Sequence, residues 1–377
     1  MTTVEIVPVQ GRTLLNRFIR LPERFYRDDP HYVAPLHLER LEALTPKNPF
    51  FGNADVQFWI ARKDGRDVGR ISAQIDHQAL ALRPDATGQF GLIAGEDDPA
   101  VFEALIATAA DWLRSRGMKR MQGPFNLSIK EEMGLLVDGF DTPPMLLMGH
   151  DRPHVGQRLE ALGLRKEKDV YAYLYDITGD LPAGARRLLD RPLPSEYKVR
   201  RLDLKRYDDE VRVITDVFND AWLENWGFVP LSEIETDHLG KSLKPLLDPR
   251  LVSIVEHKGE PVGFLICLPN LNEAIRDLGG RLLPFGWAKL LWRLKVSGLK
   301  TARVPLMGVK RSAARGVMGK LLPFLLIDAV RKEAADMGFT HVELSWILED
   351  NMPMRHMNES LGGTVYKTYR IYEMPLA

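Results

Sequence analysis

The clearest candidate for chemistry is a basic, glycine-containing loop that joins a strand to a helix. Residues 302–309 are mostly apolar, which predicts a buried strand that ends at Val309. From Leu321 the apolar residues recur on one helical face, and Pro323 fits a first helical turn. The residues between them are rich in glycine and positive charge and include Lys310, Arg311, Arg315, Gly316, Gly319 and Lys320. Free backbone amides and positive charge at a helix start predict a phosphate-binding site, although an ordinary strand-to-helix turn with solvated charges has the same composition.

A group of polar residues on the following strand could handle protons. Residues 341–346 alternate between polar and apolar, which places Glu343 and Ser345 on one face. Asn351 then suits the cap of a short helix. A carboxylate can accept the proton of an attacking amine, and a phenol can protonate a leaving group. The candidate catalytic residues are Glu343, Glu349, Asn351, Tyr366 and Tyr369.

These segments resemble the GNAT superfamily of CoA-dependent acyltransferases. Its pyrophosphate loop reads Gln/Arg-x-x-Gly-x-Gly/Ala, and its later helix reads Asn-x-x-Ala-x-x-x-Tyr-x-x-x-Gly. Asn351 and Gly362 match that helix, but Met354 replaces the small residue, Asn358 replaces the tyrosine, and Val317 replaces the first loop glycine. The resemblance implies a CoA site that consists of Val309, Lys310, Arg315, Gly316, Gly319 and Lys320. Because Asn358 cannot protonate a thiolate, the acid must lie elsewhere, at Tyr369 or Tyr366.

Longer runs narrow the resemblance. NDAWLENWGFVPLSE, GFLICLPNLNEA, ELSWILEDN, YKTYRIYE and GPFNLSIKEEMGLLVDGFD are similar to a bacterial group of tandem GNAT-like proteins that includes the bacterial ceramide synthases. The resemblance implies an acyl-CoA-dependent N-acyltransferase that transfers a long-chain acyl group to the amine of a sphingoid base. Two alternatives stay open: transfer to the amine of an amino acid or peptide, and a non-catalytic lipid-binding protein.

Paired landmarks predict an internal repeat. Val68-Gly69 matches Val262-Gly263, and Gly117 matches Gly338. We therefore expect an α/β (α+β) protein with two tandem GNAT-like domains, each a mixed, mostly antiparallel sheet flanked by helices, over residues 1–180 and 195–377. The first copy has Glu96, Asp97 and Asp98 in place of the basic loop, and these charges would repel a pyrophosphate. The prediction assigns acyl-CoA to the second copy and shaping of the acceptor site to the first.

The two copies carry different insertions, and insertions often hold specificity. One copy has the polar run 123–141, and the other has the apolar and basic run 269–300. The stretch 281–295 suits a peripheral membrane contact or a lid over a lipid chain, and equally a helix packed on the neighbouring copy. The candidate substrate residues are Asn126, Ser128, Glu131, Glu132, Trp226, Asn272 and Trp287.

Composition excludes several other classes. The chain has 377 residues with 51 basic and 51 acidic side chains, so its zero net charge disfavours nucleic-acid binding. Cys267 is the one cysteine, which rules out an internal disulfide and a thiolate metal site. No secretory signal and no apolar run of roughly 20 residues is present. We expect no metal and a cytoplasmic protein, with the option of a peripheral position on the inner face of the membrane.

Overall fold

The computed structural model describes residues 3–376, and these residues form two compact units. Unit 1 consists of Met1–Val170, Ile275–Lys289 and Lys367–Ala377, and unit 2 of Tyr171–Ala274 and Leu290–Tyr366. The strands β9 (Arg165–Asp176) and β15 (Thr364–Pro375) each pass from one unit into the other. Compared with the predicted domains 1–180 and 195–377, residues 171–180 belong to unit 2, and residues 275–289 and 367–377 belong to unit 1. The order of residues along the chain does not specify which unit such a segment joins.

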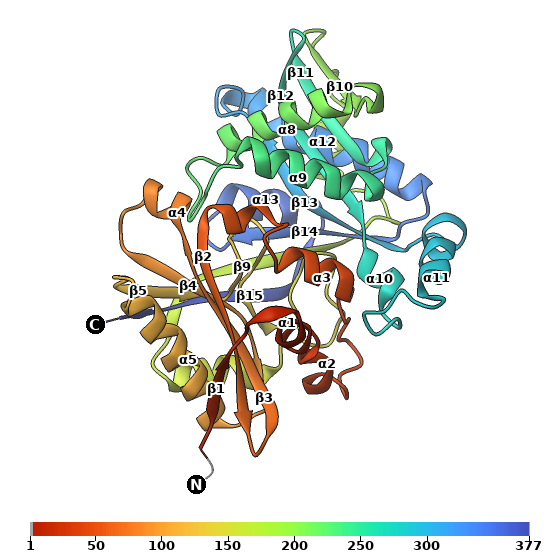
Figure 1. Ribbon diagram of the computed structural model, residues 1–377. Helices are drawn as coiled ribbons and strands as arrows, with labels where there is room; N and C mark the ends of the chain where they lie inside the picture. The colour runs from red at the N-terminus through yellow and green to blue at the C-terminus, as the bar shows by residue number, and fades with distance from the viewer. Residues whose placement is uncertain (1–2, 377) are drawn as a thin grey trace. The chain divides into compact units, whose positions relative to one another are not determined.

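Unit 1 is built on a mixed sheet whose order is β1-β2-β3-β4-β5, with the Lys367–Pro375 part of β15 next to β5 (Figure 1). Only β4 and β5 pair in parallel within this series. The short strand β8 pairs with β15, and β6 pairs with β7. The strands are β1 (Glu5–Pro8), β2 (Ala54–Lys63), β3 (Arg66–Asp76), β4 (Thr87–Gly95), β5 (Arg120–Gly123), β6 (Phe125–Asn126), β7 (Glu132–Met133) and β8 (Leu135–Asp138). The helices are α1 (Gly11–Arg20), α2 (Pro22–Phe25), α3 (His37–Ala43), α4 (His77–Leu82), α5 (Pro99–Arg114) and α6 (Pro153–Ala161).

Alternating side chains bury both faces of this sheet. Trp59 and Ala61 of β2 lie in one apolar core with α5, whereas Phe58 and Ile60 lie in another with α1. This separation follows from the two-residue period of a strand. A turn at Asp64-Gly65 joins β2 to β3, and its positive φ angles of 51° and 72° are those of a hairpin turn that favours Asp-Gly.

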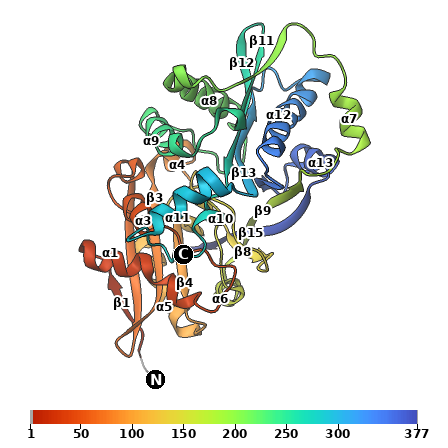
Figure 2. The ribbon, with the colours of Figure 1, turned by 90° about the vertical axis from the view of Figure 1, so that its right-hand side faces the viewer.

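Unit 2 repeats this plan. Its strands follow the order β10-β11-β12-β13-β14, and only β13 and β14 pair in parallel within that series. Figure 2 shows α8 and α12 on opposite sides of the unit 2 strands. The strands are β10 (Tyr197–Arg201), β11 (Val252–His257), β12 (Glu260–Pro269), β13 (Thr301–Val309) and β14 (His341–Leu348). The helices are α7 (Ala183–Leu189), α8 (Tyr207–Ala221), α9 (Glu233–Leu243), α12 (Gly316–Asp336) and α13 (Met352–Ser360), while α10 (Leu271–Ile275) ends at the first residue of the 275–289 segment of unit 1 and α11 (Gly286–Trp292) passes from that segment into unit 2. The predicted repeat is thus present at the level of strand order, with one long helix between the two parallel strands of each copy.

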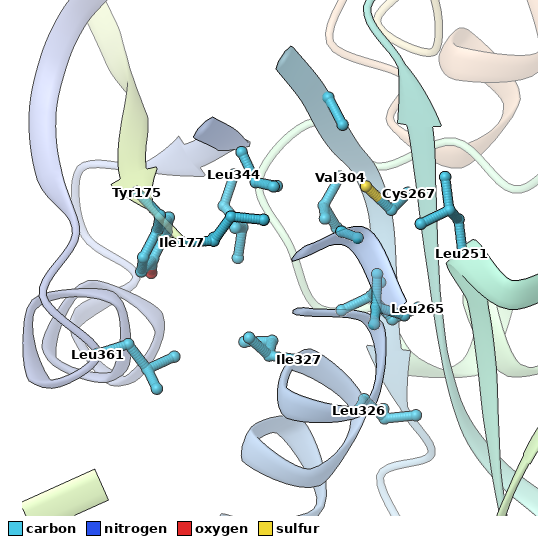
Figure 3. Packing of buried hydrophobic residues seen from close by; sticks show 14 of the residues in the cluster. Tyr175, Ile177, Leu251, Leu265, Cys267, Val304, Leu326, Ile327, Leu344 and Leu361 are labelled. Carbon is cyan, nitrogen blue, oxygen red and sulfur yellow. The ribbon is translucent and has the colours of Figure 1, made fainter. Parts of the chain in front are cut away.

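The core of unit 2 lies between α12 and the sheet (Figure 3). Leu326 of α12 packs in one cluster with Leu265 and Cys267 of β12. Burial raises the pKa of the Cys267 thiol to about 12, so this residue serves as a small apolar side chain, as the sequence predicted. Beside Ile327 a mostly apolar cavity of about 50 Å³ remains, lined also by Val304, Leu344 and Tyr175.

The end of β15 should stabilise unit 1 through one fully buried side chain. Ile371 is 0% exposed, so Ile371→Ala should lower the free energy of unfolding by about 2–5 kcal/mol through lost contacts and the cavity left behind. Val365→Ala is the matched control, because Val365 lies in the same strand but is 41% exposed, and a change within about 0.5 kcal/mol is expected. Urea denaturation measures both values. Equal losses in the two variants would contradict the burial of β15.

Candidate active site

The predicted phosphate loop opens onto the longest helix of the described chain. Helix α12 begins at Gly316 rather than at Leu321, so Pro323 lies inside the helix and not in its first turn. Arg315 occupies the N-cap position, and no side chain caps α12 within residues 3–376. The first amides of a helix have no partner within the helix, and its dipole adds positive potential at that end. The start of α12 therefore retains hydrogen-bond donors for an anion.

Several of the other loop amides already have acceptors. The Lys310 amide donates to the Val262 carbonyl at 2.8 Å, and the Ala313 and Ala314 amides donate to the Lys310 carbonyl at 2.8 and 2.9 Å. The Arg311 amide donates to Asp220 at 2.7 Å, and the Arg311 guanidinium pairs with Asp220 and Glu224. These bonds hold the loop in shape. They leave the α12 start, and not the whole loop, as the donor group for a phosphate.

Two basic residues at this helix start face solvent. Arg315 and Lys320 are exposed, and within the described residues neither forms an ion pair. Gly319 is required by packing, because a Cβ atom there would lie 2.1 Å from the carbonyl carbon of Ala314. Gly316 has a φ of +73°, which favours glycine. Both predicted glycines thus shape the turn that brings the basic residues to the helix start.

The parallel strands beside this loop diverge. Pairing of β13 with β14 runs from Thr301 and His341 to Val304 and Leu344, and the strands then continue to Val309 and Leu348 beyond the paired residues. Strands that separate expose main-chain donors and acceptors along the edges that no longer pair. This edge of β13 leads directly to the start of α12.

Unit 1 closes the equivalent helix start with its own side chains. The Asp98 carboxylate caps α5 by accepting the Ala100 amide at 3.0 Å, and Lys63 pairs with that carboxylate at 2.6 Å. Asp97 pairs with Arg158 at 2.7 Å. A carboxylate at the cap occupies the place of an incoming anion and repels it. That the pyrophosphate binds to the second copy and not to the first stays a prediction.

Unit 1 also covers the edge of its diverging strand. Pairing of β4 with β5 covers Thr87 to Gln89, and the chain segment 125–127 lies against β4 beyond that point. The Asn126 side chain accepts the Leu92 amide at 2.8 Å, and a Cβ atom on Gly91 would lie 1.7 Å from the Phe125 carbonyl oxygen. Gln74 donates to the carbonyls of Phe125 and Leu127 at 2.8 and 3.0 Å and holds the segment in place. Asn126, predicted to contact substrate, therefore has a structural partner here.

Glu343 is the centre of a buried cluster in unit 2. It is 0% exposed and forms an ion pair with Arg303 at 3.2 Å. One carboxylate oxygen accepts the Ser345 hydroxyl at 2.5 Å, and the other accepts the Tyr366 hydroxyl. Arg303, itself 1% exposed, also donates to the Ser345 hydroxyl at 2.8 Å. Both oxygens of Glu343 are thus engaged, so this carboxylate is suited to hold Tyr366 in place rather than to meet an amine.

The other predicted residues of this region lie where β14 turns into α13. Glu349 is partly exposed, and its carbonyl accepts Arg355 at 2.8 Å. Asn351 caps α13 by accepting the Met354 amide at 3.3 Å. Asn358 is fully buried and accepts the Tyr175 hydroxyl at 2.6 Å. Asn358 therefore fills a packing role at the position where the resemblance leads one to expect a catalytic tyrosine.

The two candidate acids differ in access. Tyr366 is partly exposed, whereas Tyr369 is 0% exposed and donates to the Gly149 carbonyl at 3.2 Å within unit 1. A fully buried phenol with a main-chain acceptor is held as part of the sheet. Of the two predicted acids, Tyr366 is therefore the one whose side chain a ligand could reach.

The structure brings two predicted glutamates of unit 1 into one polar cluster. Glu131 accepts the Asn48 amide group at 3.0 Å, and Glu132 accepts Asn126 at 2.8 Å and pairs with Arg40. Burial raises the pKa of Glu131 to about 7. Burial also acts on Glu132, but Arg40 and Asn126 hold its pKa below the usual value. The pair thus combines one ionised carboxylate with one that exchanges its proton near neutral pH, as acid–base pairs require.

The remaining predicted substrate residues belong to both units. Ser128 is 1% exposed and accepts the Lys130 amide at 3.2 Å in unit 1. Trp287 of α11 is 51% exposed. Trp226 and Asn272 belong to unit 2, and the Asn272 amide donates to the Asn270 side chain at 3.2 Å. Among these residues, only those of the 126–132 stretch form one cluster.

Sequence reasoning did not include several partners that complete these clusters. Arg303 pairs with Glu343, and Arg40 and Asn48 bind the two glutamates of unit 1. Asp151 is also buried, and burial raises its pKa to about 7. Arg303 was detectable, because a single arginine inside the apolar strand ARVPLMGV indicates a buried ion pair. Arg40 and Asn48 carried no such signal, since they lie in a polar region about 80 residues before their partners.

No group of three or more metal-binding side chains is placed to hold an ion within residues 3–376. Over the same residues, no helix has the length and apolar character that a membrane crossing needs.

Comparison with solved structures identifies the fold. A tandem GNAT protein from the clavulanic acid biosynthesis pathway aligns with a TM-score of 0.58 and 14% identity, covering 99% of both chains. A GCN5-related N-acetyltransferase from Sphaerobacter thermophilus aligns with a TM-score of 0.53 and 11% identity, covering 98% of this chain and 96% of that one. The repeated sheet order and the uncapped helix beside diverging strands thus belong to a tandem GNAT protein, and the predicted fold class is confirmed.

Sequence relatives give the family. The bacterial ceramide synthase of Caulobacter vibrioides (strain NA1000 / CB15N) is 54% identical over 99% of this chain and 98% of that protein. Protein YghO of Escherichia coli (strain K12) is 43% identical over 98% of this chain and 96% of that protein. No family model matches the chain. The chain belongs to the family of the bacterial ceramide synthase, and the predicted resemblance and the prediction of an N-acyltransferase are confirmed.

The raised pKa of Glu131 predicts a pH dependence of stability. Because burial raises the pKa of Glu131 to about 7, the folded protein holds this proton up to about pH 7, whereas an ordinary glutamate has a pKa of about 4.5. Between these values the folded state binds more protons, so stability is present at low pH and falls as pH rises towards 7. Glu131→Gln should reduce this fall, which urea denaturation at pH 5 and pH 8 measures. Asp151 contributes with the same sign, so part of the fall should persist.

Glu103→Gln is the matched control for that experiment, because Glu103 is an exposed glutamate on α5 in the same unit. It should leave the pH dependence of stability as in the unchanged protein. If Glu131→Gln behaved like this control, Glu131 would ionise as it does in water, and the burial argument would be wrong.

Proposed function

We propose that the protein is an acyl-CoA-dependent N-acyltransferase that transfers a long-chain acyl group to the amine of a sphingoid base, in the manner of ceramide synthesis. The observation that carries this proposal is the uncapped start of α12, with Arg315 and Lys320 beside the diverging edge of β13. The relative from Caulobacter is named a bacterial ceramide synthase, and its 54% identity over nearly the whole chain supports the same acceptor class here.

Unit 2 is proposed to bind the donor. The pyrophosphate of CoA would accept the first amides of α12 and pair with Arg315 and Lys320, since a helix start with nearby positive charge binds phosphate. Lys310 and Gly316 shape the turn, and Gly319 lets the helix approach the loop. The amide groups of the pantetheine arm are suited to pair with the main chain of β13 up to Val309, as an added strand pairs with a sheet edge.

Proton transfer is proposed to involve a carboxylate and a phenol of unit 2. Attack on a thioester requires the amine nitrogen to lose a proton and the leaving thiolate to gain one. Glu349, directly or through a water molecule, is the better base because it is partly exposed, whereas Glu343 is 0% exposed. Tyr366 is the proposed acid, positioned by Glu343 and Arg303. Asn351 orders the start of α13 and so keeps Glu349 next to the end of β14.

Unit 1 is proposed to shape the acceptor site. Glu131 and Glu132 provide negative charge and proton exchange near neutral pH, which suit an amino alcohol or amino ketone head group. Asn126 and Ser128 hold this region in place through their own hydrogen bonds.

An acyl-transfer assay tests the function. The purified protein with a long-chain acyl-CoA should acylate a sphingoid base and release free CoA, and free amino acids should give little product. Reaction with amino acids instead would support the alternative acceptor. Calorimetric titration with CoA covers the remaining alternative, because a non-catalytic lipid-binding protein would give no saturable heat.

Charge reversal tests the place of the donor. Arg315→Glu and Lys320→Glu should each raise the Kd for CoA about tenfold, which corresponds to about 1.4 kcal/mol, because each removes one favourable charge and adds an unfavourable one. Lys241→Glu is the control, since it makes the same charge change at an exposed lysine in the last turn of α9. An unchanged Kd in both loop variants would exclude this loop as the pyrophosphate site.

The stretch 281–295 is proposed to contact the inner face of the membrane. Its large apolar side chains face solvent, with Leu283 75%, Phe285 79% and Trp292 60% exposed. Basic residues such as Arg281 and Lys295 lie among them. Exposed aromatic residues interspersed with positive charge favour anionic lipid surfaces.

Vesicle binding measures this contact. The protein should sediment with vesicles that contain anionic phospholipid and less with purely zwitterionic ones. The double variant Phe285→Ser, Trp292→Ser should lose most of this binding because it removes two exposed apolar anchors. Ile234→Ser, which removes a 72% exposed apolar residue on α9, should bind normally. Equal binding of all variants would exclude the stretch as a membrane contact.

A further inference from the structure

Unit 1 contains a large groove that none of the predicted site residues occupies. Its volume is about 980 Å³, at the upper end of the roughly 300–1,000 Å³ of small-molecule sites. Its walls come from α1, from α3 and the turn after it, from β2, and from Leu282 of the 275–289 segment. The apolar wall includes Leu15, Leu38, Leu41, Val56, Phe58 and Leu282. By comparison, the cavity in the core of unit 2 holds only about 50 Å³.

Charged residues border this apolar surface. Arg12, Glu39, Glu42 and Lys47 also line the groove, and Lys47 pairs with Glu42 at 2.7 Å. An apolar floor with a charged border suits a ligand that is itself amphiphilic, with a hydrocarbon chain and a polar end. A uniformly polar ligand would leave the leucines in contact with polar groups, so it fits this groove poorly.

The groove and the glutamate pair of unit 1 share one structural element. Leu38 and Leu41 of α3 line the groove, while Arg40 of the same helix pairs with Glu132. After the helix, Lys47 lines the groove and its neighbour Asn48 donates to Glu131. A hydrocarbon chain in the groove and an amine head group near the glutamates would therefore both lie next to this short segment.

The groove is also continuous with the exposed apolar stretch. The His37 amide donates to the Gly280 carbonyl at 2.9 Å, which fixes the loop before Leu282 onto the start of α3. A Cβ atom on Gly280 would lie 2.5 Å from the His37 ring, so this close contact requires glycine. Leu282 lines the groove, and the next residue, Leu283, is 75% exposed. The exposed Leu283 is thus the direct neighbour of a residue that lines the groove.

We propose that this groove binds the hydrocarbon chain of the long-chain amine acceptor, which enters from a lipid surface past Leu283 and Leu282. The inference rests on the proposed function. It assigns the choice of the acceptor by chain length to the residues that line the groove. The bound chain lies along α3, and the amine end lies towards Glu131 and Glu132.

The experiment compares amines of increasing chain length at saturating acyl-CoA. Each methylene that enters the groove should lower the KM for the amine about fourfold in the unchanged protein. Leu38→Trp narrows the groove from a residue that is 61% exposed, so folding should be preserved. This variant should raise the KM for an 18-carbon amine at least tenfold, and it should change the KM for an eight-carbon amine and the kcat less than twofold. Leu204→Trp, at a 50% exposed leucine outside the groove, is the matched control.

A binding measurement separates this inference from the proposed function. Calorimetric titration of the unchanged protein with an 18-carbon amine, without acyl-CoA, should give saturable heat that Leu38→Trp and Leu282→Trp both weaken and Leu204→Trp does not. If no acyl transfer occurs but this pattern holds, the groove assignment stands and the proposed function fails. If transfer occurs but the groove variants keep the normal chain-length dependence for the amine, or alter only the dependence on acyl-CoA length, the groove assignment is overturned.

Discussion

The main constraint on the structure is that the two parallel strands of each unit separate and leave main-chain groups without a partner strand. A diverging strand exposes main-chain donors and acceptors that need partners. Unit 1 supplies partners from its own chain, because the segment 125–127 lies along β4 and Asp98 caps α5. In unit 2 the corresponding helix, α12, has no side-chain cap within residues 3–376, and basic residues surround its start. One fold thus carries a self-satisfied copy and a copy suited to an anionic ligand.

The two copies of the fold therefore differ in which of their polar groups already have partners. In unit 1 the segment 125–127 covers the edge of β4, and the residues that follow it place Glu131 and Glu132 in a polar cluster with Arg40. Unit 2 has a similar pair, since Arg303 and Glu343 compensate each other, and Glu343 accepts the Tyr366 hydroxyl. In both units an arginine thus pairs with a buried carboxylate.

The two units also differ in the size of their apolar cavities. The core of unit 2 is closely filled around α12, with a cavity of about 50 Å³, whereas unit 1 keeps a groove of about 980 Å³ beside α3. Large exposed apolar residues in the 281–295 stretch adjoin that groove through Leu282. Large exposed apolar patches commonly mark interaction or ligand sites, and this is the basis of the proposed membrane contact and of the proposed acceptor groove.

The sequence by itself determined the repeated fold, the family, and the segments that carry polar chemistry. These are local properties: periodicity predicted β13, glycine at 316 and 319 predicted the turn, and long runs of matching residues predicted the family. Tertiary structure alone decided which of those residues are accessible. The sequence predicted Glu343 and Tyr369 as catalytic candidates, but both side chains are fully buried and held by hydrogen bonds. Asn126 was predicted to contact substrate, but its side chain accepts the Leu92 amide. The partners of Asn126 and Tyr369 lie 34 and 220 residues away along the chain, and Glu343 pairs with Arg303 on the neighbouring strand β13. No local sequence pattern specifies contacts of this kind.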